Sequence, residues 1–191
     1  TVDPADPQLV HIVLDGCTGR FGKHVMSGRI DVRFSSNADG SLHAESTSDG
    51  LTIDGRAATR TATADIVITD TQRRITRHSE KTGTKKNGDT LTQTTDHVIV
   101  VDRATRCRTV DGTGLALVGG GRRIETSIVA FQTCETEAGE ELCPTGTIDH
   151  VNQTKGKTVH ATFDGSSTAT LEISKPKRET TESWALDCAP R

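Results

Sequence analysis

Alternation of apolar and polar residues with a period of two constrains the fold of this chain more than any other feature. Apolar residues alternate with polar ones in 159–163 and again in 169–173, on either side of the loop Asp164–Ser167. Because successive side chains point to opposite faces of a strand, such runs indicate half-buried strands. Two runs around a loop that contains glycine predict a β-hairpin.

Similar runs recur along the chain, separated by the turn signals Asn37–Gly40, Asn87-Gly88 and Gly119–Gly121. Roughly ten strands follow at the short spacing that is typical of all-β domains. We therefore expect an all-β antiparallel meander that forms a curved sheet or a barrel-like or sandwich domain. Residues 9–191 should form this single domain, and the Pro- and Asp-rich residues 1–8 should form an N-terminal spacer.

The composition indicates a thin hydrophobic core. Hydrophobic residues make up 32% of the chain, and the aromatic residues are four Phe, one Trp and no Tyr. Aromatic rings normally contribute much of the area that a core buries, so Val, Ile, Leu and Ala must do most of the packing here. A thin core favours a curved sheet or a narrow barrel over a thick sandwich, and disulfides, which stabilise a fold by about 2–4 kcal/mol each, would compensate for it.

Five cysteines lie at the ends of strand-like runs, an arrangement that predicts disulfides and an oxidising, exported location. They are Cys17, Cys107, Cys134, Cys143 and Cys188. We expect Cys134 to pair with Cys143 across the acidic loop between them. For the second bridge, Cys107–Cys188 is the first choice and Cys17–Cys188 is the second. The odd cysteine is then Cys17 or Cys107.

Charge and motifs exclude several classes of function. A net charge of −3 lacks the basic footprint of a nucleic-acid-binding protein. The seven His residues form no pair at i,i+2 or i,i+4, so we expect no metal site and no cofactor. Gly119–Gly121 precedes a strand-like run rather than a helix, which favours a hairpin turn over a phosphate loop. The weakest hypothesis is an enzyme whose site combines His150, His160 and the acidic loop 135–141.

Several short motifs resemble those of a group of uncharacterised bacterial cell-envelope lipoproteins. A Gly-Cys-Thr segment leads into Ser-Gly-x-Ile-x-Val, an Asp-Gly kink follows, and a Cys-Pro-Thr-Gly-Thr-Ile segment opens the last strands. In this chain they are Gly16–Gly19, Ser27–Val32, Leu51–Gly55, Asp111–Gly114, Cys143–Ile148 and Thr162–Gly165. Ser166 and Ser167 stand where many members carry a cysteine. The resemblance implies a β fold and an address in the bacterial envelope, and it implies no activity.

We therefore expect a non-enzymatic exported envelope protein with a structural or interaction role, based on a wide sheet face rich in Thr and Arg. The alternative is a ligand-binding module that takes a glycan, a lipid or a peptide on a concave sheet face. The expected partner is an envelope protein or a glycan. The expected location is the periplasm or the outer cell surface, with membrane contact only through a lipid anchor upstream of Thr1.

Overall fold

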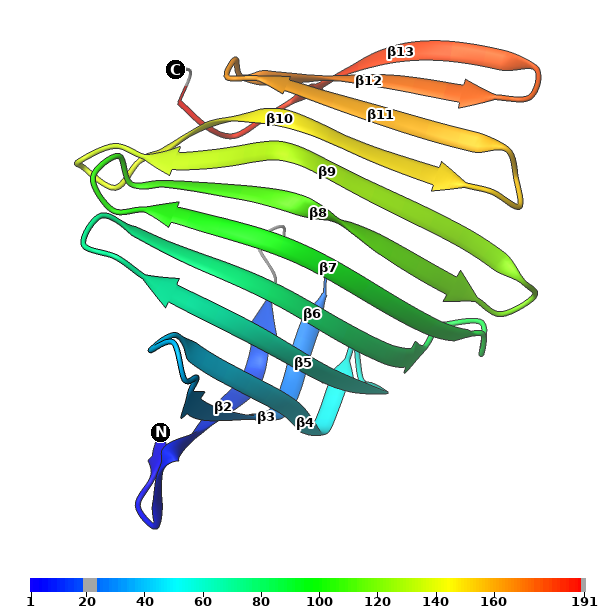
Figure 1. Ribbon diagram of the computed structural model, residues 1–191. Coiled ribbons are helices and arrows are strands. Elements are labelled where there is room, and N and C mark those ends of the chain that lie inside the picture. Colours follow the sequence, from blue (N-terminus) through cyan, green and yellow to red (C-terminus); the bar gives the residue numbers. More distant parts are fainter. Residues whose placement is uncertain (19–23, 190–191) are drawn as a thin grey trace.

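The computed structural model describes residues 1–18 and 24–189, and its strands form one antiparallel sheet in which neighbours in sequence are neighbours in space (Figure 1). The thirteen strands are β1 (Val2–Asp3), β2 (Asp6–Thr18), β3 (Val25–Ser36), β4 (Leu42–Ile53), β5 (Arg56–Ile68), β6 (Gln72–Thr84), β7 (Thr90–Asp102), β8 (Cys107–Val118), β9 (Arg122–Glu135), β10 (Glu141–Asn152), β11 (Lys157–Asp164), β12 (Thr168–Lys175) and β13 (Arg178–Ala185). The expectation of an all-β antiparallel meander is confirmed.

The expected number of about ten strands is too low. The runs at 42–44 and 51–54 belong to one strand, β4, whose register shifts between Thr47 and Thr52 without ending the pairing. Two further strands, β1 and β2, lie in the first eighteen residues, and the stretch expected as a spacer contains β1 and the start of β2. A bulge keeps a strand continuous where its alternation in sequence is interrupted.

The sheet stays open, so the expected barrel-like and sandwich forms are wrong. Among the described residues, β1 and β13 each have one neighbour and do not pair with each other. The sheet instead curls, and β2 and β3 cross behind β5–β7 in Figure 1. The accessible surface is 11738 Å², whereas a compact monomer of this mass exposes about 8,800 Å². The fold is therefore a curved layer with little interior.

Cross-strand register divides the strands into two faces, because residues directly opposite each other point to the same side. We call the face that carries Ile99 and its register partners the inner face, and the opposite one the outer face. Eight of the ten buried hydrophobic residues in the described part of the chain lie on the inner face. They are Ala44, Leu51, Ala58, Ile99, Val118, Ala161, Ala169 and Leu171. The inner face therefore holds the thin core that the composition predicts.

Two disulfides link Cys107 to Cys134 and Cys143 to Cys188, and Cys17 is an exposed free thiol. The expected pairs Cys134–Cys143 and Cys107–Cys188 are wrong. Cys134 lies opposite Leu142, so Cys143 is one residue out of register and its side chain starts on the other face. Cys107 and Cys134 lie directly opposite each other in β8 and β9, with 4.0 Å between their Cα atoms.

The second disulfide belongs to a connection between the C-terminal tail and β10. After β13 the chain turns back, and the amide of Cys143 donates to the carbonyl of Ala189 at 2.7 Å. Leu142 and Ala189 form a parallel bridge beside the Cys143–Cys188 bond. Figure 1 shows the tail leaving β13 and passing β10. Two disulfides are consistent with an oxidising, exported location.

Candidate anion-binding site

The two faces of β3–β8 carry opposite charge. Register places every Asp and Glu of these six strands on the outer face, namely Asp31, Glu45, Asp49, Asp65, Glu80, Asp96, Asp102 and Asp111. The inner face of the same strands carries no carboxylate. Its charged residues are the cations Arg56, Arg60, Arg73, Arg77, Lys81 and Arg108. A sheet polarised in this way presents an anion-attracting surface on its inner side.

The outer carboxylates already have partners, many of them His residues on neighbouring strands. Nδ1 of His11 lies 2.6 Å from Asp31, Nδ1 of His43 lies 2.7 Å from Asp65, and Nδ1 of His78 lies 2.7 Å from Asp96 (its Oδ1). Hydrogen bonding to the carboxylates raises the pKa of all three His residues. The outer face is therefore internally neutralised by short cross-strand pairs.

The remaining outer carboxylates also have hydrogen-bond or ion-pair partners. Asp49 pairs with the guanidinium of Arg29 at 2.8 Å, and Asp111 accepts the backbone amide of Ala130 at 2.7 Å. Asp102 accepts the amides of Ala104 and Thr105, which lowers the pKa of Asp102. Glu45 and Glu80 lie within 4 Å of Nε2 of His43 and His78.

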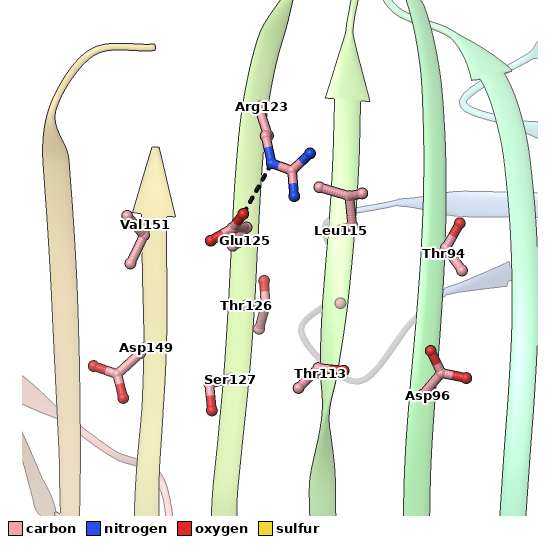
Figure 2. Close-up of a pocket in the computed structure, with 11 residues that line it drawn as sticks. Thr94, Asp96, Thr113, Leu115, Arg123, Glu125, Thr126, Ser127, Asp149 and Val151 are labelled. Atoms are coloured by element: carbon pink, nitrogen blue, oxygen red, sulfur yellow. Dashed lines mark hydrogen bonds and ion pairs between the residues drawn. The ribbon is translucent and has the colours of Figure 1, made fainter. Parts of the chain in front are cut away.

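A shallow groove of about 510 Å³ crosses the outer face over β7–β10 (Figure 2). Its floor includes Thr113 and Ser127, which stand in one cross-strand row between Asp96 and Asp149. The carboxylates around it are occupied: Asp149 lies 2.6 Å from Nδ1 of His160, and Glu125 accepts Arg123 and Gln153. This groove therefore offers neutral hydroxyls and satisfied carboxylates rather than an uncompensated charge.

The inner cations contrast with these pairs. Arg60 on β5 and Lys81 on β6 lie directly opposite each other, and burial lowers the pKa of both groups. The positive charge of Arg60 lowers the pKa of Lys81 further. Across residues 1–18 and 24–189, none of the six inner cations forms a side-chain ion pair or hydrogen bond within the protein. Half-buried like charges without a counter-ion are costly, and an anion would relieve that cost.

A pocket of about 570 Å³ opens on the inner face at the end of the sheet where two hairpin turns meet. One turn is Asp54-Gly55, with positive φ at both residues, which joins β4 to β5. The other turn, between β6 and β7, carries Lys85 and Lys86 and is closed by the Lys85 amide on the Asp89 carbonyl at 2.9 Å. Such tight turns hold the basic side chains at the pocket rim.

The charge lining this pocket is strongly positive. Of the residues that the structure describes, four cations line it, namely Arg56, Lys81, Lys85 and Lys86, and the single carboxylate is Asp54. Asp54 already binds Nδ1 of His24 at 2.8 Å and accepts the amide of Val25 at 2.9 Å, and these hydrogen bonds lower the pKa of its carboxyl group. Four positive charges minus one negative charge leave +3 with His24 neutral, in a chain whose net charge is −3.

The pocket floor is apolar, and one of its positions, Gly83, has no side chain. Ala58, Gly83 and Leu91 stand in one cross-strand row on β5, β6 and β7, and Ile53 lines the pocket beside them. The same row continues through Val118 to Arg122, whose Nε is buried and has no hydrogen-bond partner. An apolar floor below a cationic rim is the arrangement that binds a ligand with one charged end.

The structure does not bring together the residues of the loop-built enzyme hypothesis. His150 lies opposite Val159 and Thr126, so it points to the inner face, whereas His160 lies opposite Asp149 on the outer face. Glu141, at the acidic loop, lies nine positions before His150 along β10, or about 30 Å away. In the part of the chain that the structure describes, no group of three or more His, Cys, Asp or Glu is placed to hold a metal ion.

The sequence interpretation missed this pocket, although a signal was present. The face rich in both Thr and Arg that we expected does not exist in β5, because Thr59 and Thr61 point outward while Arg56 and Arg60 point inward. Separating odd from even positions of each strand would have revealed cations on the same face as Ala58. No helix in residues 1–18 and 24–189 is long and apolar enough to span a bilayer.

Comparison with known proteins assigns no relative: no protein-family profile, no curated protein and no solved structure matches this chain.

Proposed function

We propose that this chain is a non-enzymatic, exported bacterial envelope protein that binds an anionic ligand on the inner face of its sheet. The observation that supports the proposal best is the contrast between the two faces of β3–β8. The eight outer carboxylates have partners, whereas none of the six inner cations forms an ion pair or a side-chain hydrogen bond within the described residues. Of the six, Arg56 interacts electrostatically with Asp54. A binding role on a curved, partly apolar face is favoured over a purely structural one, because a structural sheet gains nothing from half-buried cations such as Arg60 and Lys81 that form no ion pair.

The envelope address is part of the proposal. Two disulfides support an oxidising compartment, and the resemblance to envelope lipoproteins favours the bacterial periplasm or cell surface. Lipid anchoring upstream of Thr1 stays a prediction that an intact mass from the native host would test.

The binding proposal is tested by equilibrium dialysis of the oxidised protein against the aromatic sulfonate 8-anilinonaphthalene-1-sulfonate at low ionic strength. The inner double variant Arg60→Gln/Lys81→Gln should weaken binding about tenfold or more, since each partly desolvated charge contributes of the order of 1 kcal/mol or more. The matched control is the outer double variant Arg33→Gln/Arg74→Gln, which removes the same charge from the other face. Equal weakening in both variants would mean that the probe responds to net charge alone, and the proposal would fail.

A further inference from the structure

The geometry points to a ligand class: we propose that the inner-face pocket binds an anionic amphiphile, an acyl chain that ends in a carboxylate or a phosphate. This inference deepens the proposed function and rests on it. The head group would lie among Arg56, Lys81, Lys85 and Lys86, and the chain would lie on the apolar floor between Ile53 and Leu91.

The head-group end follows from the charge balance at the two turns. Among the described residues, Asp54 is the only carboxylate that lines the pocket, and it is held by His24 and by the amide of Val25 at the start of β3. Its charge also interacts with Arg56. Asp89, in the β6–β7 turn, accepts the side-chain amide of Asn87 at 2.8 Å. No carboxylate of the pocket is thus committed to the lysines, and a carboxylate or phosphate of the ligand would supply the charge-assisted hydrogen bonds that they lack.

The apolar pocket floor under the cationic rim indicates where the acyl chain of the ligand would lie. Gly83 has no side chain, and it stands between Ala58 and Leu91 in the cross-strand row, so the floor is hollow at its centre. Beyond Ile53 the inner face continues apolar across β4 and β3, where Met26 lies opposite Ile53 and Leu51 is buried. A small inorganic anion would leave this apolar area in water, whereas an acyl chain would bury it at about 25 cal/mol per Å².

The size of the pocket favours a small amphiphile over an acidic peptide. A volume of about 570 Å³ is typical of sites that enclose a small molecule, which commonly measure about 300–1,000 Å³. A peptide would lie along a sheet edge or an extended groove and would use main-chain hydrogen bonds. The inner ends of β5–β7 offer no such edge, because each of these strands is paired on both sides.

The position of Gly83 allows a sharp test of where the chain lies. A Cβ placed on Gly83 would meet the Cβ of Ala58 at 3.5 Å, an ordinary contact, and this glycine is not in the left-handed region. Gly83→Leu therefore fills the pocket floor without forcing the backbone. Thr82→Leu is the matched control, because Thr82 is the preceding residue of β6 and points to the outer face.

The experiment measures binding of palmitate, hexadecyl phosphate and hexadecanol to the full oxidised chain by calorimetry, with the two anions below their critical micelle concentrations and the alcohol below its solubility limit. We expect saturable binding of one or both anions, at least tenfold weaker binding of the neutral alcohol, and at least tenfold weaker anion binding by Gly83→Leu but not by Thr82→Leu. A preference for palmitate or for hexadecyl phosphate distinguishes a fatty-acid source from a phospholipid-like source of the head group.

The other outcomes separate this inference from the function on which it rests. If acetate and inorganic phosphate bind as tightly as their acyl counterparts, or if Gly83→Leu binds normally, anion binding on the inner face stands and the amphiphile is wrong. Binding of a poly-glutamate peptide in preference to all three lipids would likewise overturn the amphiphile. If neither the sulfonate dye nor any of these anions binds, both proposals fail together.

Discussion

At the scale of single residues, the missing side chain of Gly146 determines how the C-terminal strands pack. Phe131 on β9 and Phe163 on β11 meet edge to face, with ring centroids 5.1 Å apart, although β10 lies between their strands. Gly146 lies opposite Phe163 and leaves the space over β10 free. Its φ is +105°, and a Cβ there would collide with the carbonyl of Ala130. The contact between these two rings therefore depends on a glycine.

Replacing Gly146 by alanine should lower the free energy of unfolding by about 2–4 kcal/mol, because backbone strain and overpacking add. Gly40→Ala is the control: Gly40 also has a positive φ, but a Cβ there meets nothing within 4 Å. Gly40→Ala should lower the free energy of unfolding by only about 1–2 kcal/mol, because backbone strain is the one effect that opposes it. Urea unfolding of the two oxidised variants measures the difference. Equal losses would show that the close approach to Ala130 is unimportant.

At the scale of elements, neighbouring strands are joined on the outer face by His–carboxylate pairs. His11 joins β2 to Asp31 on β3, His43 joins β4 to β5, and His78 joins β6 to β7. Hydrogen bonds to Asp31 and then Asp3 raise the pKa of His11, and the bond to His11 lowers the pKa of Asp31. These groups are at most part-buried, so each pair adds little stability by itself, and the effect comes from the repetition of the pairs along the sheet.

These pairs predict a pH dependence of stability. A raised His pKa stabilises the fold fully below the usual value near 6.5, and the stabilisation disappears as the pH rises through the raised value. Asp31 and Asp65 have lowered pKa values, so their effect on stability runs in the opposite direction along the pH scale. The stabilisation that they contribute disappears as the pH falls below the usual 3.8.

The urea midpoint should therefore decrease between about pH 6 and pH 8. The triple variant His11→Gln/His43→Gln/His78→Gln should show a clearly smaller decrease, and a decrease as steep as that of the unmodified chain would contradict the role of the pairs.

The Cys143–Cys188 disulfide connects the C-terminal tail to β10, so its removal should lower the stability of the fold and release the tail. The double variant Cys143→Ser/Cys188→Ser should lose about 2–4 kcal/mol of stability, because the unfolded chain regains the freedom of a long loop. Limited proteolysis should then cut the segment after β13 first. Cys17→Ser is the matched control and should change neither measurement, since Cys17 is unpaired and exposed. An unchanged unfolding midpoint in the double variant would show that the bond does not constrain the tail.

At the scale of the whole molecule, the protein is an open curved layer whose two faces differ in charge. The inner side is apolar and cationic, and the outer side holds carboxylates with their partners. An open layer exposes far more surface than a compact domain of equal mass. The same openness that limits the core is what makes the inner face accessible to a ligand.

Solution scattering should detect this shape. A compact domain of 191 residues has a radius of gyration of about 16 Å, and the open sheet should give a clearly larger value at a monomer mass measured by light scattering. A value near 16 Å at monomer mass would mean that the sheet closes in solution. Closure would also cover the inner face and so contradict the binding proposal.

The strand class, the hairpin turns and the thinness of the core can all be predicted from the order of the residues alone. Those properties are local: alternation in 159–163, the Asn87-Gly88 turn and a scarcity of aromatic residues act through the backbone and through composition, whatever the partners are. The sequence also indicated disulfides, because cysteines at strand ends lie where strands are joined. It could not supply the cysteine partners, since Cys134 and Cys143 are near in sequence and yet one residue out of register.

Which face of the sheet is inner, and therefore where the cations lie, depends on how the strands pair and on how the sheet curls. Arg60 and Lys81 are separated by twenty-one positions in sequence, and register alone places them opposite each other on the face that also holds Ala58. Because the sheet curls, this face is partly shielded from water, and a cation that forms no ion pair there is costly. A site built from cross-strand register and curvature depends on pairings between distant residues, and no local pattern in the chain encodes them.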